Sequence, residues 1–142
     1  MHRIVTIVGA ALFATSTAYA HTSRPQTLTY EAITAISPVG ISRLRVTELD
    51  IGDYALDFSI VAPNKTQHTG HIQGLATKHG NRFILKVPTF QPDGNVDHPF
   101  LCRLVVDVNE TGAKVVSEQG CAGFSGAAAS FFEQGQNLVR MP

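Results

Sequence analysis

The sequence lacks an excess of charge of either sign. Its 142 residues include 11 basic and 11 acidic side chains, and the sequence pI is about 7.0. Binding to nucleic acid or to an anionic membrane surface needs a surplus of Lys and Arg on one face, so neither partner is expected. The hydrophobic content of 44% is that of one folded domain rather than of a disordered tail.

The sequence also lacks a long apolar run. Its most continuous one, residues 4–13, is about ten residues long, whereas a membrane-spanning helix needs roughly 20. No membrane span is therefore expected. This run follows the basic start Met1-His2-Arg3 and precedes Ala18-Tyr19-Ala20, which places small residues at a cleavage site. The pattern predicts a secretory signal peptide, residues 1–20.

Cleavage after Ala20 would leave one domain of residues 21–142 in the periplasm or outside the cell. The competing interpretation, an N-terminal core strand or helix, is disfavoured by the polar stretch that follows directly at residues 21–25.

Cysteine is scarce, with only Cys102 and Cys121. In an exported chain an even pair is expected to form a disulfide. A redox site usually shows Cys-x-x-Cys, and a zinc site would need further ligands at short spacing; the chain has neither pattern. A structural disulfide is therefore predicted.

No segment shows a helical pattern of twelve or more residues. Apolar residues instead recur at every second position, the period of a strand with one buried face. The alternating sets are Leu44 and Val46; Tyr54, Leu56, Phe58 and Ile60; Ile72, Gly74 and Ala76; Phe83, Leu85 and Val87; and Cys102, Leu104, Val106 and Val108. Turn residues separate these runs at 62–65, 78–81, 91–95, 109–112 and 118–120. The pattern predicts an all-β fold, a small antiparallel barrel or sandwich of about seven to eight strands.

Two segments are ambiguous between strand and helix, residues 28–36 and residues 127–133, and a strand is favoured for both. Cys102 is expected to face inward on its strand, and Cys121 to follow a strand over residues 113–117. The three glycines within residues 120–126 indicate a tight corner next to the disulfide.

The order of several of these features resembles a known group of proteins. The shared features are Gly74-Leu75-Ala76, Leu101-Cys102-Arg103-Leu104, Ala113-Lys114-Val115-Val116-Ser117-Glu118, and Gly120-Cys121 followed by Gly126 and Phe131. Over about residues 68–133 the chain resembles small exported, mostly uncharacterised proteins that are similar to secreted bacterial lysozyme inhibitors. The resemblance implies a compact antiparallel β-barrel with a disulfide. It also implies a non-enzymatic, inhibitor-like protein that binds another envelope or extracellular protein, such as a cell-wall lytic enzyme.

No catalytic residue is predicted. Ser125 lies in Gly-Phe-Ser-Gly, which is not the Gly-x-Ser-x-Gly pattern of a nucleophile elbow. Asp50, Asp53 and Asp57 would form an acid and base pair only if two of them faced a cleft. Asp53 and Asp57 share the strand face opposite the apolar side chains, which indicates solvent. A small hydrolase is therefore the least favoured of the functional hypotheses.

The histidines of the expected mature chain are His21, His68, His71, His79 and His98. Three residues separate His68 from His71, which on a strand directs them to opposite faces, and the other two internal histidines are expected in loops. After the predicted cleavage His21 is the first residue, and its amine and imidazole would offer two nitrogens to a copper ion, with His98 or His71 as a further ligand. The alternative function is therefore a periplasmic copper-binding protein, weighed against an ordinary flexible terminus.

Overall fold

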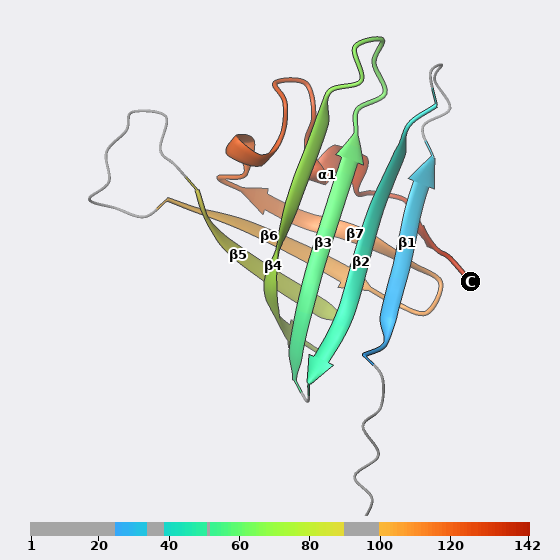
Figure 1. Ribbon diagram of the computed structural model, residues 1–142, viewed down its shortest axis with the longest axis vertical. Helices are drawn as coiled ribbons and strands as arrows, with labels where there is room; N and C mark the ends of the chain where they lie inside the picture. The colour runs from blue at the N-terminus through green and yellow to red at the C-terminus, as the bar shows by residue number, and fades with distance from the viewer. Residues whose placement is uncertain (1–24, 34–38, 51, 90–99) are drawn as a thin grey trace, which may run out of the picture.

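The strands form one closed barrel (Figure 1). The computed structural model describes residues 25–33, 39–50, 52–89 and 100–142. Within these residues eight antiparallel strands pair in chain order, and the last pairs with the first. The elements are β1 (Thr27–Ile33), β2 (Ile41–Asp50), β3 (Asp53–Val61), β4 (Thr69–His79), β5 (Arg82–Thr89), β6 (Phe100–Val108), β7 (Gly112–Gln119), the 3₁₀ turn η1 (Ala122–Phe124), α1 (Phe131–Gln134) and β8 (Leu138–Arg140). The predicted all-β fold is confirmed, and of the two predicted architectures the structure has the barrel rather than the sandwich.

The core fills the barrel with inward-facing side chains at alternate positions. Leu44 pairs with Phe58, and Phe58 pairs with Ile72, so three neighbouring strands bring these side chains together. Further residues with at most 1% of their surface exposed include Tyr30, Leu56, Ile60, Leu85, Cys102, Leu104, Val106 and Val115. Burial of each large apolar side chain contributes roughly 1.5–3 kcal/mol, so this alternation is the main stabilising pattern.

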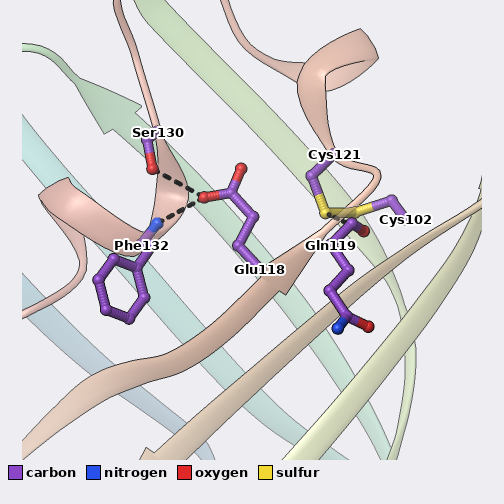
Figure 2. The surroundings of a disulfide bond; sticks show 6 residues. All are labelled: Cys102, Glu118, Gln119, Cys121, Ser130 and Phe132. Atoms are coloured by element: carbon purple, nitrogen blue, oxygen red, sulfur yellow. Dashed lines mark hydrogen bonds between the residues drawn. A yellow bond between two sulfur atoms is a disulfide. The ribbon is translucent and has the colours of Figure 1, made fainter.

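The short helix α1 closes one end of the barrel. Phe131 is fully buried, and its ring centroid lies 5.5 Å from that of Phe58. Glu118 fixes the start of the helix, because its Oε2 accepts hydrogen bonds from Ser130 Oγ at 2.8 Å and from the backbone N of Phe132 at 2.7 Å (Figure 2). The Glu133 backbone N donates to Ser130 Oγ at 3.3 Å, so Ser130 is the N-cap.

Two expectations for local structure need correction. The strand expected over residues 127–133 is wrong, since Phe131–Gln134 is helical and the last strand comes later, at Leu138–Arg140. The turn expected over residues 78–81 is narrower, since β4 extends through His79 and β5 begins at Arg82. For the other ambiguous segment, β1 confirms a strand through Ile33, and residues 34–36 lie outside the described residues, as does the expected turn at 91–95.

Candidate functional site

The predicted disulfide between Cys102 and Cys121 is present (Figure 2). Cys102 faces the core from β6, as expected, and the exposed fractions of the two residues are 0% and 2%. The chain turns from β7 into Cys121 at Gly120, whose φ of +68° is a conformation that glycine adopts without strain. The bond therefore fixes a buried corner next to the end of the barrel that carries α1.

The segment that follows the disulfide, residues 121–126, lies along the start of β4. Gly70 and Ser125 form an antiparallel bridge, and Gly126 N donates to Thr69 O at 2.9 Å. The approach is close, because a Cβ at Gly126 would lie 3.0 Å from Nδ1 of His68. The disulfide corner thus holds the residues with which β4 begins.

The first residues of β4 are joined to β3 by residues 62–68, which we call the β3–β4 loop. In Figure 1 this loop stands out beyond the strands, at the end of the barrel where α1 lies. Its base is closed by a hydrogen bond from Ala62 N to His68 O at 2.8 Å. Pro63, Lys65 and Thr66 are exposed at its tip.

Asn64 organises the interior of the β3–β4 loop. Its Oδ1 accepts hydrogen bonds from Thr66 Oγ1 at 3.1 Å and from His68 N at 3.3 Å. Its backbone O accepts from Gln67 N at 3.0 Å, and its backbone N donates to Ala62 O at 2.8 Å. The side chain and the backbone N and O of Asn64 therefore make four hydrogen bonds that order the loop from within.

The same loop contains a strained residue. Gln67 has a φ of +44° and is the one non-glycine residue with positive φ in the described part of the chain. Such a conformation costs about 1–3 kcal/mol, is retained only where the surroundings enforce it, and is commonest at functional sites. The β3–β4 loop is therefore the candidate functional site.

The carboxylates that the sequence suggested lie on the outer face of β3 and at the exposed end of the β2–β3 hairpin. Asp57 lies on the outer face of β3, where its Oδ2 is 3.5 Å from Arg45 Nη1 and its Oδ1 is 2.9 Å from His71 Nε2. Asp50 and Asp53 lie opposite each other in register at the exposed end of the β2–β3 hairpin. Asp57 is thus matched with cationic and imidazole groups rather than with a second carboxylate.

The described histidines are not brought together. His71 is exposed on the outer face of β4, His68 is half-buried against the disulfide corner, and His79 is exposed at the far end of β4. His21 and His98 lie outside the described residues. Among the residues that are described, no group of three or more His, Cys, Asp and Glu side chains could hold a metal ion.

Sequence reasoning placed a turn at residues 62–65 but did not recognise it as a site. The signal was the combination of Pro63, Asn64 and the five further residues before the alternation of β4 resumes at Gly70. Ser125 has a structural role, because it forms an antiparallel β-bridge with Gly70 next to the disulfide.

Comparison with protein-family models, with curated proteins and with solved structures finds no match to this chain. In the described ranges no helix has both the length and the apolar character needed to cross a membrane.

Proposed function

We propose that the protein is an exported, non-enzymatic binding protein that contacts another envelope or extracellular protein through the β3–β4 loop. The observation that carries this proposal is the state of the loop before binding: exposed at its tip, closed at its base and held internally by Asn64. A loop that is ordered in advance loses little conformational entropy on binding, and this raises affinity for a given contact area.

Export is supported by two independent features. The buried disulfide is compatible with an oxidising compartment, where such bonds form and persist. Residues 1–20 carry the basic start, the short apolar run and the Ala-x-Ala ending of a secretory signal peptide. Both features support a periplasmic or secreted location.

The first class of partner to test is a cell-wall lytic enzyme, because residues 68–133 resemble proteins similar to secreted lysozyme inhibitors. The function is then inhibitor-like: a tight complex in which the bound protein blocks access to the enzyme. No group of this chain takes part in a reaction.

The test is complex formation with lysozyme, measured by calorimetry and by inhibition of cell-wall lysis. Asn64→Ala removes the acceptor that Thr66 and His68 share, so we expect it to weaken the complex by about tenfold or more through lost loop order. The matched control is Asn81→Ala, in the exposed turn between β4 and β5, which should leave the affinity unchanged. Absence of a complex, or equal weakening by both variants, would contradict the proposal.

One observation favours the alternative, a periplasmic copper-binding protein that uses His21. Nε2 of His71 lies 2.9 Å from Asp57 Oδ1, and a carboxylate on one ring nitrogen is the contact that commonly orients a histidine whose other nitrogen binds a metal. In this hypothesis calorimetry with copper should show tight binding that is abolished by His21→Ala or by an extra Gly before His21. Affinity no stronger than that of an exposed histidine in a peptide would exclude it.

A further inference from the structure

The basic side chains of the barrel are unevenly placed. Arg82, Lys86, Arg103 and Lys114 all lie at outward-facing positions of β5, β6 and β7, and we call these four residues the basic strip. In Figure 1 these strands form the wall of the barrel behind β2 and β3. Among the described outward-facing positions of the three strands, Asp107 is the one acidic residue. This face therefore carries a surplus of positive charge, which the balanced composition of the whole chain conceals.

Two members of the basic strip lie directly opposite each other. Lys86 of β5 and Arg103 of β6 are cross-strand partners. Within the part of the chain that the structure describes, neither of them forms an ion pair with a carboxylate. Like charges at directly opposed positions destabilise a sheet. An anion bound between the two side chains would remove this repulsion, so the pair points to an anionic ligand.

The other two members of the basic strip flank one carboxylate. Asp107 of β6 is the direct cross-strand partner of Arg82 on β5 and of Lys114 on β7. Arg82 binds Asp107 through Nε at 2.7 Å and through Nη2 at 3.1 Å, which is one edge of the guanidinium group. A guanidinium carries donors on a second edge and can bind another oxyanion there. This row of three residues therefore has one cation more than it has anions and can accept a second anion.

A hollow of about 480 Å³ lies at this row, lined by Arg82, Lys114 and the exposed Asn81 among others. The side-chain amide of Asn81 both donates and accepts hydrogen bonds, as the hydroxyl groups of a sugar require. At the other row, Gln119 of β7 is the cross-strand partner of Arg103 and supplies the same amide chemistry. Each row thus combines cationic groups with an amide that suits a sugar hydroxyl.

The basic strip is longer than it is wide. Arg82 and Lys86 are four positions apart on β5, so the two rows lie about 13 Å apart along the strands. An extended polymer with an anionic group on each unit can reach both rows, whereas one small anion cannot. Ile84 and Val105 are paired between the rows, and neither offers the aromatic ring on which nucleic-acid bases stack. The strip therefore fits a single anionic polymer chain better than a nucleic acid.

We propose that the basic strip binds an anionic polysaccharide, a polymer whose sugar units carry carboxylate groups. The cationic side chains of the strip bind the carboxylates, and the amides of Asn81 and Gln119 bind the sugar hydroxyls. None of these residues belongs to the β3–β4 loop, so this proposal does not depend on the proposed function.

Calorimetry of the purified protein with polygalacturonate at low ionic strength tests this proposal. We expect binding that weakens as salt is added, and no binding to neutral dextran. Lys86→Gln and Arg103→Gln should each weaken the binding by about threefold to fivefold, and the double variant by about tenfold or more. The matched control is Arg45→Gln on the outer face of β2, where Asp57 Oδ2 lies 3.5 Å from Arg45 Nη1. It removes the same charge outside the strip and should leave the binding unchanged.

Thermal unfolding separates weaker binding from weaker folding. Because Lys86 and Arg103 repel each other in the unbound protein, Lys86→Gln should keep or raise the unfolding temperature while it weakens the binding. A lower unfolding temperature for this variant would contradict a pair held at a cost for a ligand.

Absence of binding to polygalacturonate, or equal weakening by Arg45→Gln and Lys86→Gln, would overturn the proposal. Three further anionic probes test the class of ligand: polyglutamate, single-stranded DNA and vesicles of anionic lipid. We expect each to bind more weakly than polygalacturonate, because none presents carboxylates together with sugar-ring hydroxyls to the strip. Equal or tighter binding of one of them would overturn the polysaccharide and assign the strip to that class of partner.

Discussion

Phe58 joins the barrel to α1, since it is fully buried between its neighbours in the sheet and lies against Phe131. Phe58→Ala should lower the free energy of unfolding by about 3–5 kcal/mol, from lost burial and the cavity that remains. Its neighbour Asp57 faces outward, so Asp57→Ala should change stability little. Urea denaturation of both variants checks this, and equal losses would show that the strand register is wrong.

Asp107 gives stability a dependence on pH. The hydrogen bonds and charge of Arg82 hold the pKa of the Asp107 carboxyl below its usual value. Because the pKa is lower in the folded state, the ion pair stabilises the protein above the ordinary Asp pKa of about 4. This stabilisation is lost as the pH falls through the pKa of Asp107 in the folded state. Asp107→Asn should therefore destabilise the protein at neutral pH but not in strong acid.

Because Arg82 is exposed, this effect should be small and should shrink further with added salt. Urea denaturation of Asp107→Asn and of the wild type, at neutral pH and in strong acid, measures this difference in stability. A larger loss in acid than at neutral pH would show that the sign is wrong.

At the scale of elements, the disulfide links β6 to the corner that follows β7. Cys102→Ser or Cys121→Ser should lower the free energy of unfolding by about 2–5 kcal/mol, and the double variant should be no worse, because either change removes the same bond. Thermal or urea unfolding of the three variants provides the measurement. Two reactive thiols in the native, oxidised protein would contradict the disulfide.

The strands were predictable because their signal is local. A strand with one buried face repeats every second residue, and Leu56, Phe58 and Ile60 show that repeat without knowledge of the partner strand. The predicted pairing of Cys102 with Cys121 was equally accessible, since the chain has no other cysteine.

The helix α1 was not predictable because its causes are distant in sequence. Its start depends on Glu118 in β7, twelve residues before Ser130, and its position depends on Phe58. The internal order of the β3–β4 loop was missed for a related reason, since a sequence shows that Asn64 is a turn residue but not that its side chain is shared between Thr66 and His68.

For the molecule as a whole, the predicted signal peptide sets where the mature chain should begin. We expect an exported form of the protein to begin at His21, because the small residues Ala18 and Ala20 match the pattern that precedes a signal-peptide cleavage site. N-terminal sequencing or intact mass measurement provides the check. Exported material that retains Met1 would contradict the signal peptide.

The barrel closes through few pairings. β8 is matched to β1 only at Tyr30–Arg140 and Glu31–Val139, and to β7 only at Gly112–Val139 and Ala113–Leu138. The β1–β8 pairs join positions more than a hundred residues apart, so this seam should form late in folding and open first in the native state. In amide hydrogen exchange, Val139 should exchange faster than Phe58, and equal protection would contradict a weak seam. The short strand β8 is thus the place where the barrel would first open.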